Sequence, residues 1–304
     1  MRIRYEKQGI HFYDRISGLH ILLDDVSVPS EIIHIGPRVI SVALTNVCNF
    51  NCSFCYAPNN SNTLNRDYVY DLCLAMDSLG VLEVAFGGGE PTLYPHLTEL
   101  CKKIWNSTNL GISITTNGHH LTKGLINDLV SNISTIRLSI DAMDPLYSEI
   151  RGRSLSDLTE KIRYLRNEIP FGINIVINNR TIGYLDDIMD YAKNYGAESL
   201  LLLPEVQKGG SFVLDKNCWV ELENWINKNW TEFPLEITSC ACNYLNCPYL
   251  FEIEEELELS YWHIDAEGKI RESSYYEGGT PIRDGKSLIN FFMKLNTIRN
   301  NRQN

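Results

Sequence analysis

Residues 39–55 read VISVALTNVCNFNCSFC and join an apolar segment to a cysteine-rich loop. The first six residues are mostly apolar and rich in Val and Ile, which is typical of a buried strand in a parallel sheet. Cys48, Cys52 and Cys55 have the spacing C-x3-C-x2-C. Three thiolates on one short loop can bind three irons of a [4Fe–4S] cluster and leave the fourth iron open to another ligand. The stretch predicts a strand that ends at an iron–sulfur site.

A zinc knuckle and a turn with buried thiols are the two other interpretations of these cysteines. A zinc knuckle needs a fourth ligand close by, and no His or Cys lies between Cys55 and Cys73. The spacing therefore favours the cluster.

The chain after residue 38 alternates short apolar runs with longer amphipathic stretches, which indicates βα units and a parallel sheet. Six such units are fewer than the eight of a closed barrel. We expect an α/β fold, a partial (β/α)6 TIM-like barrel open on one side. The predicted strands are 39–44, 82–86, 111–116, 134–140, 171–177 and 199–203, and the predicted helices are 65–78, 94–106, 121–130, 155–168, 182–195 and 216–228.

Two smaller parts flank the barrel, which we assign to residues 38–230. Residues 1–37 alternate apolar and polar positions around Ser17-Gly18, which predicts an N-terminal β-hairpin. Residues 231–304 form a small α+β C-terminal extension, with a hairpin that turns near Gly268 and a helix at about 286–298. We expect the hairpin and the extension to form the walls of the barrel mouth.

The composition excludes several classes of protein. The net charge of −11 and the pI near 5.1 argue against non-specific binding to nucleic acid. The first residues have no apolar core of signal-peptide length, and no run approaches 18 apolar residues, so no membrane contact is expected. Nine cysteines without a secretion signal are typical of a reducing compartment. We expect a cytoplasmic protein.

Candidate site residues lie at or directly after the carboxyl ends of all six predicted strands. In a parallel βα barrel the loops after the strands meet at one rim, where reactive groups lie. These segments should therefore surround a single site. They are the cysteine loop, residues 87–91 (GGGEP), residues 115–118 (TTNG), Ser139 with Asp141, Asn174 with Val176, and Pro204 with Glu205.

Three glycines, Gly87, Gly88 and Gly89, follow the second strand. Glycines let a ligand approach the backbone closely, although a tight turn with positive φ explains them equally well. Glu90 comes next, and a carboxylate beside exposed carbonyls suits an ammonium group better than a phosphate.

The pair CNFNCSFCY and GGGEP resembles the motifs of the radical S-adenosylmethionine (radical SAM) superfamily, over about residues 38–205. The resemblance implies that Cys48, Cys52 and Cys55 hold a [4Fe–4S] cluster whose open iron binds the methionine part of SAM. It also implies further contacts to SAM from Phe54, Tyr56, Gly87, Gly88, Gly89, Glu90, Asn117, Ser139, Asp141, Arg151, Asn174 and Val176. Arg151 resembles the arginine that pairs with the SAM carboxylate in the peptide-modifying branch.

Some of these residues also have a purely structural interpretation. Phe54 and Val176 are compatible with a place in the core. Arg151 is compatible with a solvated residue at a helix start, and Asn117 with a simple turn.

The resemblance implies one-electron chemistry. An external donor such as flavodoxin or ferredoxin reduces the cluster, SAM is cleaved to methionine and a 5′-deoxyadenosyl radical, and the radical abstracts a hydrogen atom from the substrate. The cofactor supplies the difficult step, and the protein supplies orientation and exclusion of water.

The C-terminal extension resembles the SPASM or Twitch extensions of peptide-modifying relatives, but it departs from their pattern. Glu272, Ser273 and Ser274 stand where a cysteine normally follows the hairpin, and no cysteine occurs after Cys247. We expect a degenerate extension without a cluster. The alternatives are one further Fe–S cluster or zinc on Cys240, Cys242, Cys247 and Cys218, or a redox-active cysteine.

The leading hypothesis is a peptide-maturase-like radical SAM enzyme that acts on a peptide or another small polar substrate. A nucleotide, sugar or cofactor precursor is the alternative substrate class, and a non-catalytic sensor or scaffold is the alternative of another kind. Candidate catalytic residues are Cys240, Glu205 and Lys208.

Overall fold

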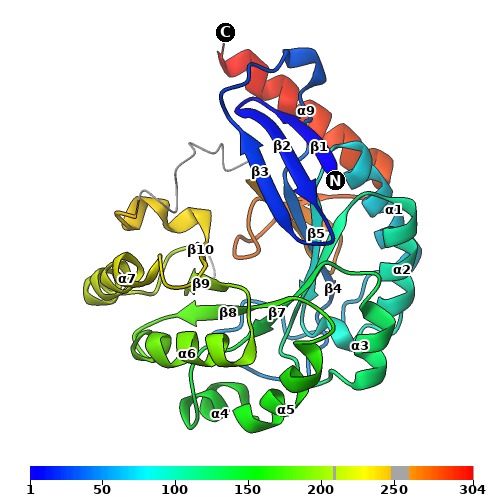
Figure 1. The fold of residues 1–304 in the computed structure, drawn as a ribbon. Coiled ribbons are helices and arrows are strands. Elements are labelled where there is room, and N and C mark those ends of the chain that lie inside the picture. The colour runs from blue at the N-terminus through cyan, green and yellow to red at the C-terminus, as the bar shows by residue number, and fades with distance from the viewer. Residues whose placement is uncertain (208–209, 248–259, 304) are drawn as a thin grey trace.

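The computed structural model describes residues 1–207, 210–247 and 260–303, and its centre is a ten-stranded sheet (Figure 1). The strand order is β10-β9-β8-β7-β6-β5-β4-β11-β12-β13, so the sheet does not close on itself. All six predicted strands lie in it as parallel neighbours, which confirms the partial barrel. They are β4 (Val39–Thr45), β5 (Glu83–Gly88), β6 (Gly111–Thr116), β7 (Thr135–Ser139), β8 (Phe171–Ile177) and β9 (Leu200–Pro204).

The predicted barrel helices are present, each after its strand. They are α1 (Arg66–Ser78), α2 (Leu97–Ser107), α3 (Lys123–Leu129), α5 (Leu155–Leu165), α6 (Leu185–Tyr195) and α7 (Lys216–Asn229). One short helix between β7 and α5, α4 (Leu146–Arg151), was not predicted.

Two further parallel pairings that the sequence did not predict lie at the sides of the barrel, one of them made by the first strand of the predicted C-terminal hairpin. β10 (Leu235–Ile237) pairs with β9, and β11 (Tyr261–Ile264) pairs with β4. β10 is only three residues long, and β11 pairs with a strand more than 200 positions earlier in the chain. Neither pairing can be inferred from a local sequence pattern.

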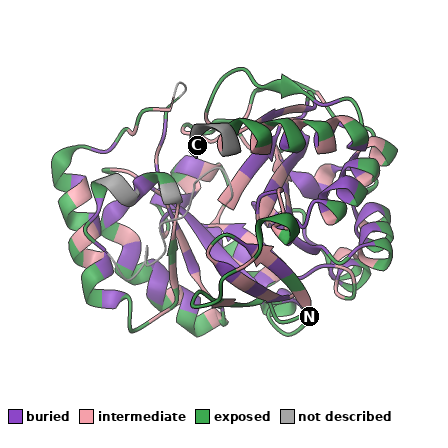
Figure 2. Cartoon of the chain, turned by 90° about the horizontal axis from the view of Figure 1, so that it is seen from above, coloured by how far each residue is buried: buried purple, intermediate pink, exposed green. Residues whose placement is uncertain are grey.

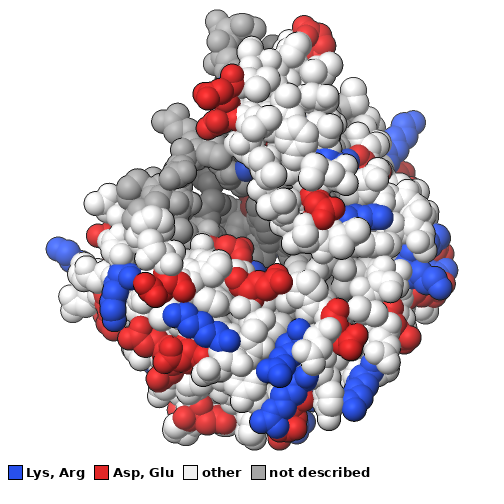
Figure 3. Space-filling model, in the orientation of Figure 1, with Lys and Arg blue, Asp and Glu red and all other residues white. Residues whose placement is uncertain are grey.

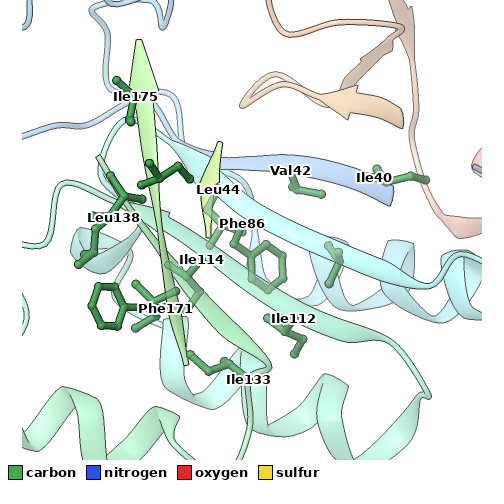
Figure 4. Packing of buried hydrophobic residues seen from close by; sticks show 14 of the residues in the cluster. Ile40, Val42, Leu44, Phe86, Ile112, Ile114, Ile133, Leu138, Phe171 and Ile175 are labelled. Atoms are coloured by element: carbon green, nitrogen blue, oxygen red, sulfur yellow. The ribbon is translucent and has the colours of Figure 1, made fainter. Parts of the chain in front are cut away.

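The main core lies between the barrel strands and their helices. Along β4, Ile40, Val42 and Leu44 are fully buried in it, while Ser41 and Ala43 lie on the opposite face, toward the barrel interior. Figure 4 shows these three side chains with Phe86, Ile112 and Ile114 of the next strands. Figure 2 shows that the surrounding helices also have both buried and exposed positions. The interior of the barrel is thus left to small and polar side chains.

The N-terminal segment is a three-stranded antiparallel sheet rather than a hairpin. The predicted hairpin around Ser17-Gly18 is confirmed as β2 (Gly9–Asp14) and β3 (Leu19–Leu23), and β1 (Arg2–Glu6) pairs with β2 at its other edge. The expected strand pattern of β1 is hidden because charged residues occupy its buried face.

The expected position of this sheet at the barrel mouth was wrong. Arg2 binds Asp77 and Arg15 binds the carbonyl groups of Trp105 and Thr108, all near the ends of helices that lead into the next strand. Tyr13 lies against Gly111, the first residue of β6, where a Cβ atom would stand 1.8 Å from the Tyr13 hydroxyl. The sheet therefore closes the end of the barrel opposite the mouth.

The C-terminal extension confirms the predicted hairpin and helix. β11 continues into β12 (Lys269–Arg271), then β13 (Thr280–Pro281) and α9 (Gly285–Gln303). α9 packs beside α1, where the Tyr68 hydroxyl donates to the Ile282 carbonyl at 2.7 Å and the Gly285 amide donates to Asp71 at 2.6 Å. Of the helices in the described ranges, none has the length and apolar character needed to cross a membrane.

We predict that Glu6→Gln destabilises the fold. The Glu6 carboxylate is buried and accepts hydrogen bonds from Arg4 at 2.7 Å and Arg38 at 2.9 Å. Burial alone would raise the pKa of Glu6, but hydrogen bonds from His11 and Arg38 and the charge of Arg4 lower it. Removing the charge leaves two guanidinium groups without their carboxylate, so we expect the free energy of unfolding in urea at pH 7 to fall by about 3 kcal/mol.

The effect of Glu6→Gln should depend on pH. Because the pKa of Glu6 is lower in the folded state, its contribution is present above the unfolded pKa of about 4.3 and is lost as the pH falls further. Below that pH, the free energies of unfolding of the variant and the parent should therefore become more similar. Glu99→Gln is the control, since Glu99 also pairs with an arginine, Arg66, but is 59% exposed and should change stability by less than about 1 kcal/mol. Equal effects of both variants would contradict the prediction.

Candidate functional site

The segments singled out after the strands lie together at the carboxyl ends of β4 to β9. The strands are parallel neighbours in one sheet, so their following loops share one rim. The cysteine loop, residues 46–62, follows β4 and lies next to the glycine segment after β5, with the Gly89 amide donating to the Thr45 carbonyl at 2.6 Å. The loop after β6 joins them, since the Asn117 side chain donates to Asn49 at 2.8 Å.

All three loop cysteines are free thiols at or near the surface. Cys48 and Cys55 are exposed and Cys52 is partly exposed. Partial burial raises the pKa of Cys48 and of Cys52, and the positive charge of Arg151 opposes this at Cys52. The Arg151 guanidinium lies 3.6 Å from the Cys52 sulfur. The loop thus presents its sulfurs where a metal cluster could reach them.

The thiols fit a cluster better than they fit a single metal ion. Within the described ranges, no three His, Cys, Asp or Glu side chains are gathered closely enough to hold one ion. A [4Fe–4S] cube binds its cysteines at different iron atoms. The three accessible thiols do not converge on one point, and neighbouring segments fix their loop. They therefore meet the requirement of a cluster.

The three glycines at the end of β5 have different roles, and Gly87 and Gly88 are the last two residues of the strand. Gly88 has φ +118°, and a Cβ atom there would stand 2.3 Å from the Thr45 carbonyl oxygen. A Cβ atom at Gly89 would stand 2.3 Å from the carbonyl oxygen of Val47. Gly88 and Gly89 are therefore required by the close approach of the end of β4 and of the cysteine loop, and the positive φ that the turn interpretation invoked occurs at Gly88 but not at Gly87 or Gly89. Gly87 has nothing within 4 Å of its Cβ position, and its backbone remains open to a ligand.

Glu90 is buried and ties two rim loops together. One carboxylate oxygen accepts from the Thr92 amide at 3.0 Å and from the hydroxyls of Thr92 and Thr116 at 2.5 Å each. The other oxygen accepts from the Asn117 amide at 2.8 Å. Only the second oxygen keeps capacity for a further donor. Binding of an ammonium group at Glu90 stays a prediction, and the carboxylate already has a structural role.

Asp141 and Arg151 form a buried ion pair beside the cysteine loop. Asp141 is 1% exposed, accepts two hydrogen bonds from Arg151, one of 2.7 Å, and also accepts from the Val176 amide at 2.9 Å. Burial alone would lower the pKa of Arg151, but the charges of Asp141 and Cys52 raise it. Arg151 ends α4 and its side chain is 9% exposed, so it is not a solvated residue at a helix start.

The remaining predicted SAM contacts lie close to this pair. Phe54 packs on Ala142, Leu146 and Ile150, and the Arg151 guanidinium lies 5.4 Å from the centre of its ring. Ser139 is paired with Asn174 in the sheet. The Asn174 side chain accepts from Arg137 at 2.8 Å on the interior face of the barrel.

Residues of the C-terminal extension reach the same rim. The Tyr56 ring, next to Cys55, lies 5.1 Å from the Tyr275 ring. The Ser41 hydroxyl on β4 lies 2.6 Å from the Tyr261 hydroxyl and 2.7 Å from the His263 ring. Burial lowers the pKa of His263 to about 3, and the charge of Arg271 adds to this, so His263 is neutral at pH 7. Of these contacts, Tyr56–Tyr275 lies at the rim, whereas those of Ser41 lie in the first half of β4, inside the barrel.

The tail cysteines do not form a second site among the described side chains. Cys218 and Cys247 are buried in the main core, whereas Cys240 is exposed and its sulfur lies 3.1 Å from the Thr238 hydroxyl. The Cys242 side chain lies outside the described part. Of the other catalytic candidates, Glu205 accepts from Asn178 at 2.7 Å, and Lys208 lies outside the described residues.

Sequence reasoning missed the partners that hold the rim. Thr92 and Thr116 bind Glu90, and Asn49 binds Asn117. One signal was available: Glu90 precedes Pro91 as the cap of a short 3-10 helix, η2 (Pro91–Leu93), and a cap residue binds amides two or three positions later. Nothing in the local sequence links Asn49 to Asn117.

The Asp141–Arg151 pair should show strong energetic coupling. Because both side chains are buried, Asp141→Asn or Arg151→Met alone should lower the free energy of unfolding by about 3 kcal/mol. The double variant should cost at least about 2 kcal/mol less than the sum of the two. Urea unfolding of the reduced, metal-free chain measures this cycle. The exposed pair Arg180–Glu149 is the control, with less than about 1 kcal/mol for Arg180→Ala, and additive effects at Asp141 and Arg151 would refute the coupling.

Comparisons with known proteins agree with this geometry. A curated relative, the probable GTP 3′,8-cyclase of Methanococcus aeolicus, is 29% identical over 169 residues, which is 52% of this chain and 56% of the relative. The chain thus spans about half the length of the curated relatives that it matches. Crystal structures of similar fold include Streptococcus suis SuiB bound to precursor peptide SuiA, with a TM-score of 0.67, 15% identity, and coverage of 89% of this chain and 81% of that one.

A second solved structure, native anSMEcpe with bound AdoMet and Cp18Cys peptide, has a TM-score of 0.62 and 17% identity, covering 85% of this chain and 83% of that one. The model of the radical SAM superfamily matches residues 42–192, which include the cysteine loop, the glycine segment and the Asp141–Arg151 pair. Membership implies a [4Fe–4S] cluster and SAM as cofactors. The chain belongs to the radical SAM superfamily.

Proposed function

We propose that this chain is a radical SAM enzyme that abstracts a hydrogen atom from a peptide held at the open end of the barrel. The observation that carries the substrate class is the extent of the fold similarity. It covers 85–89% of the chain, and so includes parts outside the barrel, in structures whose titles name a bound peptide. We further propose that the protein is cytoplasmic and takes its electron from an external one-electron donor such as flavodoxin or ferredoxin.

In this proposal Cys48, Cys52 and Cys55 hold the cluster. The bound cluster and SAM together supply reductive cleavage of the sulfonium and a radical that abstracts hydrogen. The Asp141–Arg151 pair fixes the guanidinium beside the Cys52 sulfur, where its positive charge stabilises the thiolate. The chain's contribution at this point is charge compensation and a fixed loop.

The rest of the rim positions SAM. Gly87 offers open backbone to the methionine part, and the second oxygen of Glu90 offers one acceptor. Phe54, Tyr56, Asn117, Ser139, Asn174 and Val176 surround the adenosine part in this proposal. Because Asn117 and Val176 are held by Glu90 and Asp141, their backbone is fixed before SAM arrives. Such preorganisation lowers the cost of orienting a bound cofactor.

The substrate would enter between the cysteine loop and the C-terminal extension. Tyr56 and Tyr275 meet there, and Cys240 lies on the same side of the barrel after β10. Cys240 and Glu205 are the described side chains that we propose as catalytic candidates. In this proposal the extension acts as a wall without a cluster, because Glu272, Ser273 and Ser274 stand where a cysteine normally follows the hairpin and no cysteine occurs after Cys247.

A nucleotide is the second candidate substrate. The curated relatives named GTP 3′,8-cyclase favour it, since 26–29% identity over 157–173 residues exceeds the identity to the peptide-bound structures. Comparing formation of 5′-deoxyadenosine in the presence of GTP and of a cysteine- and serine-rich peptide mixture separates the two. Stimulation by GTP, with loss of GTP, would replace the peptide assignment.

Cys55→Ala should abolish the reaction. The anaerobically reconstituted, dithionite-reduced parent should form 5′-deoxyadenosine from SAM, and the variant should form no more than the enzyme-free control, because a cluster ligand is lost. Ser53→Ala, an exposed hydroxyl on the same loop, should keep its iron and its activity. Product formation by Cys55→Ala at the parental rate would exclude the cluster assignment.

Iron content tests the proposal for the extension. We expect about four irons per chain after reconstitution, against about eight if a second cluster exists. The variant with Cys240, Cys242 and Cys247 all changed to Ala should carry the same iron as the parent. A loss of about four irons in that variant would show that the extension binds a cluster.

A further inference from the structure

The N-terminal sheet buries its charged face against the barrel. Arg4 is 1% exposed and donates to the carbonyl groups of Gly36 at 2.5 Å and Gly80 at 2.7 Å. Glu6 and Tyr13, on the same face, are also buried. Side chains alternate between the two faces along each strand, so every second residue of β1, β2 and β3 lies on the outer face.

That outer face is apolar in two rows across the sheet. The register aligns Ile3, Phe12 and Ile21 in one row. Tyr5, Ile10 and Leu23 form the second row, and Leu19 extends the patch along β3. We call these seven residues the outer patch. Ile3, Leu19, Ile21 and Leu23 are 47%, 49%, 42% and 45% exposed, so the patch is open to solvent.

The arrangement reverses the usual burial of a two-faced sheet, in which the apolar side faces the core. In Figure 1 the sheet stands in front of the barrel with no other described element over it, and the corresponding surface in Figure 3 is largely without charge. β3 is also an edge strand, with no neighbour on its outer side among the described strands. An exposed apolar patch on such an edge indicates an interface.

We propose that the outer patch is the interface of a homodimer, in which two copies pack their patches together about a two-fold axis. This inference rests on the sheet alone and is independent of the proposed function. With the Met1 side chain at its edge, the patch exposes roughly 600 Å² per copy, so two copies bury about 1,200 Å², the lower limit for stable interfaces. Most soluble homo-oligomers are two-fold symmetric dimers.

A second copy suits the patch better than a charged partner. Neither row contains Asp, Glu, Lys, Arg or His, and Asp14, opposite Leu19, lies at the end of the patch. Identical patches satisfy each other, and two β3 edges can lie antiparallel. Each chain carries a net charge of −11, so repulsion between the copies opposes association at low ionic strength and is screened by salt.

Sedimentation velocity of the full, reduced chain between about 1 and 100 µM tests the dimer at this size of interface. We expect the dimer fraction to rise over this range and to increase with added NaCl. Ile21→Glu, which places a charge between Leu19 and Leu23 on β3, should raise the chain concentration at the midpoint of dimer formation at least tenfold. Val220→Glu, at a residue of α7 that is 53% exposed, should leave the midpoint unchanged.

Each outcome decides the proposal. A monomer at every concentration overturns it, and so does a dimer that Ile21→Glu leaves intact or that NaCl dissociates. Circular dichroism of Ile21→Glu shows whether it is folded. If it is not, Leu23→Lys at the edge of the patch replaces it and should raise the midpoint in the same way. If monomeric Ile21→Glu still forms 5′-deoxyadenosine, the interface is separate from the chemistry at the rim.

Discussion

The buried Glu90 carboxylate holds the functional rim together. Removing a carboxylate from water is costly unless hydrogen bonds replace its hydration, and Glu90 accepts four, from two loops. The backbone amides of Gly89 and Glu90 extend this support, since they donate to the carbonyl oxygens of Thr45 and Val47. The cysteine loop is thereby fixed at its start by the segment after β5. Its position follows from the ends of β4, β5 and β6 together.

Arg151 supports the same loop from the other side. It contacts the Cys52 sulfur and the Phe54 ring, and Asp141 holds it in place. Asp141 in turn binds the Val176 amide on β8. The loop after β4 is therefore connected to β8 through one ion pair, and the rim behaves as one structure rather than as six separate loops.

The sequence allowed the barrel and its chemistry to be predicted, because both depend on local patterns. Apolar runs such as VISVAL and LEVAF mark the strands, and the cysteine spacing with GGGEP marks the family. Pairings between distant residues could not be predicted, among them β11 with β4 and Asn49 with Asn117. The N-terminal sheet was misplaced because its charged face is the buried one, against the usual rule.

A layer of polar side chains lies inside the barrel, between the rim and the end that the N-terminal sheet covers. Arg137 donates to Asn174 and to Ser199 at 2.8 Å each, and Glu83 accepts from Ser113 at 2.5 Å. Burial raises the pKa of Glu83, while Ser113 and Arg137 oppose that shift. Below this polar layer the N-terminal sheet closes the barrel with Tyr13 against Gly111. The interior between these two ends carries amide, hydroxyl and charged side chains, which suit polar groups better than an apolar chain.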